Sequence, residues 1–147
     1  MSTEDNRAIV RRYIEGLWNQ GDLAVADQIL TPDYAAHDPG TPGRGERPGP
    51  AGEQQVVQMY RTVFPDLYFT VEDQITEGDK VVVRWISHGT HRGELLGLAP
   101  TGRQTRVTGI TILCLASGKI AENWSNWDAL GLLQQVGAIP APEQAGR

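Results

Sequence analysis

The chain has 147 residues, the size of one domain with a substantial buried core. Hydrophobic residues make up 39% and charged residues 21%, a composition that excludes an intrinsically disordered chain. The formal net charge of -5 leaves no excess of positive charge to neutralise phosphates, so we expect neither nucleic acid nor a membrane surface as a partner.

The N-terminal residues Met1 to Asn6 lack the basic and apolar regions of a secretory signal. No stretch of the chain approaches the roughly 20 apolar residues of a membrane span. The single cysteine, Cys114, lies in an apolar run and is interpreted as a small buried hydrophobe. These features predict a cytoplasmic protein.

The first part of the chain shows helical periodicity. Apolar residues recur at helical spacing from Glu4 to Asn19, which predicts an amphipathic helix that ends near Gly21. A second short helix is predicted from Leu23 to Leu30, because Pro32 ends it. Only a short strand, from Tyr34 to His37, fits before the next break.

The segment from Pro39 to Gly52 is dominated by Gly and Pro, which predicts a long surface loop. Loops of this length are often lids or mobile segments. Helical spacing returns from Glu53 to Phe64 and predicts a third helix.

The second half of the chain predicts an antiparallel sheet. The segments Leu67 to Thr76 and Val81 to His88 are rich in β-branched and aromatic residues and flank a turn, so they predict a hairpin. Two further strands, Gln104 to Leu115 and Lys119 to Trp127, continue the meander.

Asp128 precedes a short helix that is predicted to run through Val136 and to end at Gly137. Residues 141–147 are expected to be a disordered tail. The order of elements predicts one α+β domain over residues 1–140. Its three N-terminal helices should pack on the concave face of a strongly curved antiparallel sheet, giving a cone.

Several short motifs occur in a recognisable order along almost the whole chain. They are Trp18-Asn19-Gln20-Gly21-Asp22, His37-Asp38-Pro39, Phe64-Pro65-Asp66-Leu67, Gly89-Thr90-His91-Arg92-Gly93, Pro100-Thr101-Gly102 and Trp127-Asp128. In this order and spacing they resemble the SnoaL-like polyketide cyclase family of the NTF2-like superfamily. The resemblance implies a pocket between the sheet and the helices, a homodimer, and chemistry without a metal or an organic cofactor.

Two positions depart from that family pattern. The characterised cyclases carry an Asp after the Trp of the last strand, in an E-x-W-D type motif, whereas Ser125 follows Trp124 here. Those cyclases also carry a His on the preceding long strand, and its position corresponds to Thr111 in this chain. A serine hydroxyl is a poor base for a carbon-bound proton, so neither acid/base role carries over. We expect Ser125 and Thr111 to line the pocket and to donate hydrogen bonds.

A more distant resemblance is to the ketosteroid isomerase of the same fold. Its helix-1 Tyr and its aspartate in an Asp-Pro step resemble Tyr13 and Asp38. In that chemistry the Asp takes a proton next to a carbonyl, while an oxyanion hole that includes the Tyr stabilises the enolate. We therefore predict Asp38 as the base, with Tyr13 and the neighbouring His37 as further catalytic residues.

Each catalytic candidate also has a structural interpretation. Asp38 stands before a proline, which favours a turn, and a histidine such as His37 at a strand end is often a hydrogen-bonded structural residue. Asp128, the fourth candidate, occupies the N-cap position of the last helix, where a carboxylate satisfies free backbone N–H groups. His88 and His91 lack metal-ligand spacing on one element, so no metal site is predicted.

Aromatic and polar side chains of the helices and the last strands are candidates for the pocket wall. Strand alternation places Asn123, Ser125 and Trp127 on one face and Trp124 on the other. The predicted substrate-binding residues are Trp18, Tyr34, Met59, Tyr60, Thr111, Asn123, Ser125 and Trp127.

The resemblance and the candidate residues together predict a cofactor-independent acid/base enzyme that acts on a ketone-bearing, mostly apolar, polyketide-like substrate. Cyclisation, isomerisation and hydroxylation are all compatible with this prediction. The alternative, favoured by Ser125 and Thr111, is a non-catalytic small-molecule-binding or stress-associated module that keeps the pocket.

Overall fold

In the part of the chain that the structure describes, five strands form one sheet in the order β1-β5-β4-β3-β2. They are β1 (Leu30–His37), β2 (Tyr68–Glu77), β3 (Lys80–Thr90), β4 (Gln104–Ala116) and β5 (Lys119–Trp127). The computed structural model describes residues 2–41 and 43–142. Neighbouring strands from β2 to β5 are antiparallel, whereas β1 is parallel to β5. The predicted run of antiparallel strands is confirmed from β2 to β5, and the short first strand adds a parallel edge beside β5.

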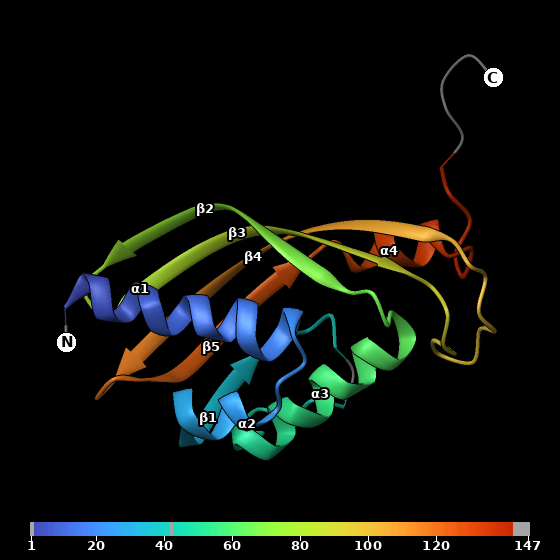
Figure 1. The fold of residues 1–147 in the computed structure, drawn as a ribbon. Coiled ribbons are helices and arrows are strands. Elements are labelled where there is room, and N and C mark those ends of the chain that lie inside the picture. The colour runs from blue at the N-terminus through green and yellow to red at the C-terminus, as the bar shows by residue number, and fades with distance from the viewer. Residues whose placement is uncertain (1, 42, 143–147) are drawn as a thin grey trace.

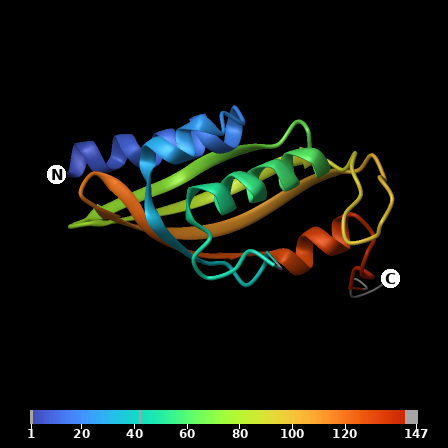
Figure 2. The same cartoon turned by 90° about the horizontal axis from the view of Figure 1, so that it is seen from below.

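Helices cover the concave side of this sheet. They are α1 (Thr3–Arg11), the π-helical η1 (Arg12–Asn19), α2 (Ala24–Ile29), α3 (Gly49–Val63) and α4 (Ala129–Gln135). Figures 1 and 2 show α1, α2 and α3 on the same side of the strands, which curve around them. The α+β fold with helices packed against a curved sheet is confirmed. None of the described helices is long and apolar enough to cross a membrane.

The first helix changes type halfway along. The predicted helix from Glu4 to Asn19 is α-helical to Arg11 and then continues as the π-helix η1. A π-helix closes each hydrogen bond over five residues, and such segments are frequent at functional sites. The wider turn brings Tyr13 and Trp18, five residues apart, onto the same face, where both contact the interior cavity described below.

Helix α3 begins at Gly49, four residues before the predicted start at Glu53, because Pro50 is compatible with the first turn of a helix. The Gly- and Pro-rich loop is shorter than predicted for the same reason. It also reaches into the protein, since the side chain of Arg44 is only 5% exposed. The tail predicted for residues 141–147 lies largely outside the described residues.

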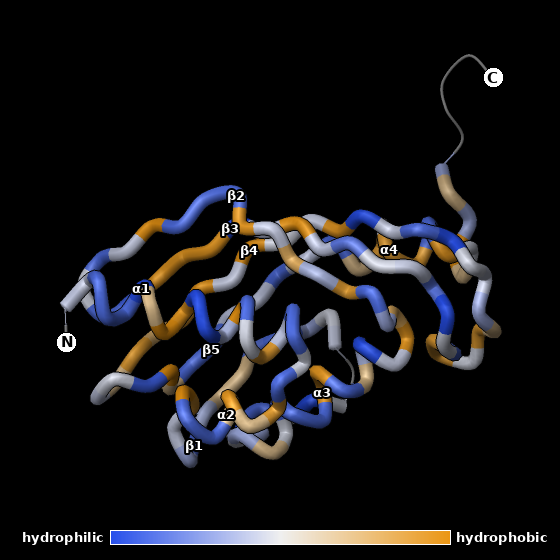
Figure 3. Tube along the Cα trace, in the orientation of Figure 1, coloured by the Kyte–Doolittle hydropathy of each residue, from blue (hydrophilic) through white to orange (hydrophobic). Residues whose placement is uncertain are grey.

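Strand alternation creates the two faces of the sheet. Along β4, Thr105, Val107, Thr111 and Leu113 are buried on the concave face, whereas Ile110 is 49% exposed on the outer face. Figure 3 shows the apolar residues concentrated along β3 and β4, while β2 at the sheet edge is mostly polar. The core therefore lies between the central strands and the helices.

Candidate active site

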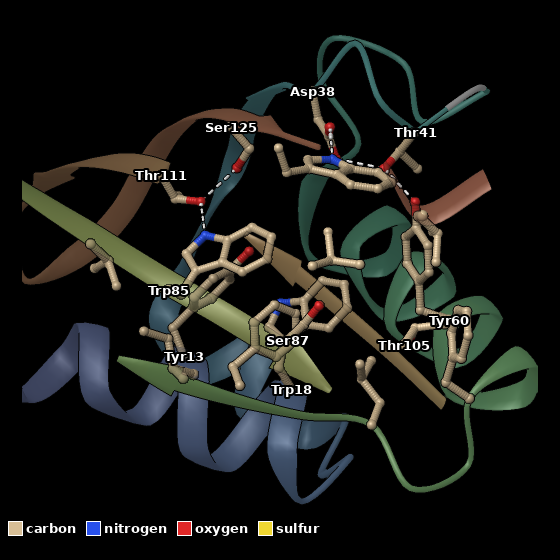
Figure 4. Close-up of a pocket in the computed structure, with 18 of the residues that line it drawn as sticks. Tyr13, Trp18, Asp38, Thr41, Tyr60, Trp85, Ser87, Thr105, Thr111 and Ser125 are labelled. Atoms are coloured by element: carbon tan, nitrogen blue, oxygen red, sulfur yellow. Dashed lines mark hydrogen bonds between the residues drawn. The ribbon is translucent and has the colours of Figure 1, made fainter. Parts of the chain in front are cut away.

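A cavity with a volume of about 100 Å³ lies between η1, α3 and the concave face of the sheet. This is several times the space that one water molecule needs. Large apolar side chains form most of the wall, including Trp18, Phe64, Phe69, Trp85, Trp127 and Leu132. The polar members are Tyr13, Asp38, Thr41, Arg44, Tyr60, Ser87, Thr105, Thr111 and Ser125. Figure 4 shows these side chains converging from the helices and the strands.

Thr111 on β4 and Ser125 on β5 are direct partners across the strand pair, and their hydroxyl oxygens are 2.9 Å apart. The indole nitrogen of Trp85 donates a hydrogen bond of 2.9 Å to Thr111 (Figure 4). Trp85 can lie flat over β4 because residue 109 is glycine; a Cβ atom at Gly109 would lie 2.3 Å from the indole ring. The two positions that depart from the family pattern thus lie side by side in the cavity wall.

The hydrogen bonds continue from Ser125 to the helices. Ser125 donates to the amide oxygen of Asn123 over 2.7 Å, and the amide nitrogen of Asn123 donates to the hydroxyl of Tyr13 over 3.2 Å. Tyr13 in turn donates to the carboxylate of Glu53 on α3. Burial, and next the charge of Glu53, raise the pKa of Tyr13 above its usual range, so Tyr13 keeps its proton.

Arg44 is the centre of a buried cluster of charges. Its guanidinium donates to Asp38 over 2.7 Å and to Glu53. The side chains of Arg44 and Asp38 are each 5% exposed, and that of Glu53 is fully buried. Burial, the largest single influence, lowers the pKa of Arg44, but the carboxylate of Glu53 together with Tyr13 and Tyr34 outweighs it, so the pKa is raised overall. The cluster carries two carboxylates and one cation, and it joins the loop after β1 to α3.

Both carboxylate oxygens of Asp38 accept hydrogen bonds from two groups each. Oδ1 accepts from the indole nitrogen of Trp127 at 2.9 Å and from the backbone nitrogen of Gly40 at 3.2 Å. Oδ2 accepts from Thr41 at 2.6 Å and from Arg44 at 2.7 Å. A carboxylate has about four lone-pair positions, so Asp38 is fully hydrogen-bonded in this conformation. The turn predicted at Asp38 is present, and Asp38 also lies in the cavity wall.

Tyr60 on α3 completes this side of the cavity. Its hydroxyl lies 2.9 Å from that of Thr41, as Figure 4 shows. Burial raises the pKa of Tyr60 above its usual value. Its ring packs edge-on against Trp127 and at a tilt against Trp18, which fixes three aromatic walls relative to one another.

Two predicted catalytic residues lie outside the cavity wall. His37 stacks on Trp124 and contacts Glu122 at 2.7 Å on the outer face of the sheet, because consecutive strand residues point to opposite faces. Asp128 caps α4, where its Oδ1 accepts a hydrogen bond of 2.9 Å from the backbone of Gly131. The N-cap interpretation of Asp128 is confirmed.

The predicted substrate-binding residues divide into three groups. Trp18, Tyr60, Thr111, Ser125 and Trp127 line the cavity. Tyr34 and Asn123 are fully buried behind it, where Tyr34 approaches Arg44 and Asn123 supports Ser125 and Tyr13. Met59 is 42% exposed on the far side of α3 and does not reach the cavity.

Sequence reasoning missed Arg44 and Glu53. Arg44 is surrounded by glycines and prolines, and that composition indicated only a surface loop. Glu53 occupies a helix position among polar neighbours, although its spacing of three and four residues from Val56 and Val57 places it on the buried face. That spacing was the available signal, and it identifies a buried charge that needs a cation. The residues described contain no cluster of three His, Cys, Asp or Glu side chains suited to a metal ion.

The chain is similar in sequence to two curated Streptomyces enzymes. It is 30% identical over 130 residues to the nogalonic acid methyl ester cyclase of Streptomyces nogalater, covering 88% of this chain and 95% of the relative. It is 32% identical over 141 residues to the aklanonic acid methyl ester cyclase AcmA of Streptomyces galilaeus, covering 95% of each.

Solved structures show the same architecture. TsrD from Streptomyces laurentii superposes with a TM-score of 0.82 at 29% identity, covering 95% of this chain and 99% of TsrD. IdmH from Streptomyces antibioticus superposes with a TM-score of 0.78 at 33% identity, covering 90% and 98%. The sequence profile described as SnoaL-like polyketide cyclase matches residues 8–136, which span η1, the cavity and α4. The chain therefore belongs to the SnoaL-like polyketide cyclase family.

Proposed function

We propose that the protein is a cofactor-independent cyclase that closes a ring in a ketone-bearing, largely apolar polyketide. The cavity supports this proposal, because aromatic walls of this kind bind flat, apolar molecules. The family supports it as well, since two relatives are named as cyclases of nogalonic acid and aklanonic acid methyl esters.

The observation that carries the proposal is the position of Asp38. Among the described residues that line the cavity, it is the one acidic side chain. Its Oδ1 has the weaker pair of hydrogen bonds, both from neutral donors, and the one from Gly40 is long at 3.2 Å. Oδ2 is held by Arg44 and Thr41. We therefore assign Oδ1 as the atom that accepts a proton when the bond from Gly40 gives way.

The proposed reaction needs one group that first accepts a proton and later returns it. Asp38 Oδ1 takes a proton from the carbon next to the ketone, and the electron pair of that C–H bond forms the enolate. The enolate carbon attacks a second carbonyl carbon of the same molecule, and the new alkoxide takes the proton back from Asp38. Arg44 and Trp127 hold the carboxylate in place during both transfers.

The test is the variant Asp38→Asn with an aklanonic acid methyl ester type substrate. We expect turnover to fall by about a hundredfold or more, because removal of a positioned general base typically costs that much. The matched control is Glu122→Gln, an acid-to-amide change on the outer face beside His37, which should keep turnover. Unchanged turnover in Asp38→Asn would show that Asp38 is not the base.

The second candidate function is a non-catalytic binding module. The four hydrogen bonds on Asp38 favour it, because they leave the carboxylate no unused lone pair in this conformation. The wild-type protein distinguishes the two functions. Saturable ligand binding with no product from any polyketide methyl ester would support the module and contradict the cyclase.

We also infer that the protein forms a homodimer through the outer face of its sheet. Apolar side chains on this face include Ile75, which is 62% exposed, and Ile110, which is 49% exposed. The helices α1, α2 and α3 lie on the opposite side (Figures 1 and 2). A second copy of the same face would remove these side chains from water.

A further inference from the structure

Side chains in and behind the cavity wall form a hydrogen-bonded chain with a fixed direction at each end. Its members, in order, are Trp85, Thr111, Ser125, Asn123, Tyr13 and Glu53. At one end the indole N–H of Trp85 can only donate, and it donates to Thr111. At the other end the carboxylate of Glu53, paired with Arg44, can only accept, and it accepts from Tyr13. Because both ends are fixed, the direction of each bond between them can be deduced.

The deduction starts at Glu53. Tyr13 has a single hydroxyl hydrogen, which it gives to Glu53, so Asn123 must approach Tyr13 with its amide nitrogen. The amide oxygen of Asn123 then faces Ser125 and accepts the hydrogen of its hydroxyl over 2.7 Å. With that hydrogen used, Ser125 can only accept in its 2.9 Å contact with Thr111. Thr111 is therefore the donor in this pair.

The hydroxyls of Thr111 and Ser125 consequently have no hydrogen left for a ligand. Each hydroxyl has one hydrogen and two lone pairs. Thr111 accepts from Trp85 and donates to Ser125, and Ser125 accepts from Thr111 and donates to Asn123. One lone pair is left on each oxygen, and both residues line the cavity.

Tyr60, on another wall of the cavity, also has its hydroxyl hydrogen in use. Thr41 gives its hydrogen to Asp38 over 2.6 Å, so Tyr60 must be the donor in its 2.9 Å contact with Thr41. Tyr60 also lines the cavity, and its hydroxyl therefore has only lone pairs left for a further partner. The earlier expectation that Ser125 and Thr111 donate hydrogen bonds to the ligand does not fit this network.

We propose that Thr111 and Ser125 form a subsite that binds a hydroxyl group of the ligand, such as a phenol. A hydroxyl can donate its hydrogen to the lone pairs that the pair presents, whereas a ketone or ether oxygen offers another lone pair and is left unpaired. The inference rests on the proposed function, because it takes a polyketide-like ligand in the cavity as its starting point. It adds the orientation of that ligand, since the reacting ketone must lie elsewhere in the cavity.

The test compares three probes that share one flat ring system: 2-hydroxyanthraquinone, 2-methoxyanthraquinone and unsubstituted anthraquinone. Dissociation constants follow from quenching of the tryptophan fluorescence. We expect the wild-type protein to bind the hydroxyl probe about fivefold more tightly than the other two, the typical value of one neutral hydrogen bond.

Variants at Thr111 and Ser125 test whether these two residues cause the preference for the hydroxyl probe. Thr111→Val and Ser125→Ala should each remove most of it, whereas Thr111→Ser keeps a hydroxyl and should retain it. The matched control is Thr108→Val, the same change on the outer face of β4, which should also retain the preference. Circular dichroism of each variant verifies that it is folded.

Two results would overturn the inference. Equal or tighter binding of the methoxy or unsubstituted probe by the wild-type protein would contradict the acceptor subsite, while binding itself would leave the proposed function intact. A preference for the hydroxyl probe that survives in both Thr111→Val and Ser125→Ala would also contradict the acceptor subsite and leave the proposed function intact. If none of the three probes binds, the proposed function is contradicted together with the inference.

Discussion

Arg44 and Glu53 form an ion pair in the interior, with 5% and 0% of their side chains exposed, and this pair fastens the loop after β1 to helix α3. The same guanidinium pairs with Asp38 in the cavity wall. The position of the proposed base thus depends on a cation from a loop that has no regular secondary structure.

Replacing Arg44 should destabilise the protein strongly. Arg44→Met leaves Asp38 and Glu53 buried without a cation, and breaking a buried pair in this way typically costs about 3–5 kcal/mol. The free energy of unfolding in urea measures the loss. The control is Arg84→Met, which removes a pair with Asp73 whose side chains are 52% and 57% exposed, and should cost about 1 kcal/mol or less. Equal losses in the two variants would show that the buried cluster has no special role.

Alkaline pH should destabilise the protein through Tyr34. Burial, and next the carboxylate of Glu53, raise the pKa of this fully buried tyrosine well above 10, its ordinary value. Above pH 10 the unfolded chain loses a proton that the folded chain retains. The contribution of Tyr34 to the free energy of unfolding is therefore fully present below pH 10 and is lost as the pH rises beyond it. Each such tyrosine lowers the free energy of unfolding by about 1.4 kcal/mol per pH unit in this range.

Tyr34→Phe removes one such group and should make the decrease less steep. Its hydroxyl contacts Arg44 only at 3.5 Å, so the variant should fold. The measurement compares urea unfolding at pH 8 and pH 11 for both proteins. If the two lose the same stability between these values, Tyr34 does not contribute to the alkaline transition.

Regular periodicity predicted much of the fold and part of the site. Alternation along β5 correctly separated Ser125 and Trp127 from Trp124, because strand residues point to opposite faces in turn. The same rule was available for His37 and Asp38, which are adjacent and were both assigned to the pocket. With Asp38 in the cavity, His37 points to the other face.

The charge cluster could not be predicted in the same way. Glu53 contacts Tyr13, which is 40 residues away in sequence, and Arg44 in an irregular loop. Periodicity specifies the face of a helix or strand, but it does not specify where an irregular loop folds back. A buried Glu53 needs a cation, but that requirement alone does not identify Arg44 among the several arginines of the chain.

The proposed homodimer predicts that a charged substitution on the outer face of the sheet prevents association. Ile110→Glu replaces an exposed apolar side chain on the outer face of β4 with a carboxylate, which would lose its water on association. Light scattering after gel filtration should show a dimer for the wild-type protein and a monomer for this variant. The control Leu96→Glu alters an apolar side chain that is 72% exposed outside the strands, and it should leave the dimer intact. A wild-type monomer, or a dimeric Ile110→Glu, would contradict the proposed interface.

Trp127 orients Asp38, and Gly40 makes this contact possible. A Cβ atom at Gly40 would lie 2.6 Å from the indole nitrogen, so Gly40→Ala must displace the ring and break its 2.9 Å hydrogen bond to Asp38. Loss of a hydrogen bond to a charged group should lower kcat by about tenfold, because the carboxylate is no longer held in position. Trp127→Phe removes the same N–H while keeping most of the ring, and should produce a similar loss. If both variants keep the wild-type kcat while circular dichroism shows a native fold, the indole is only part of the wall, and Arg44 and Thr41 suffice to hold Asp38.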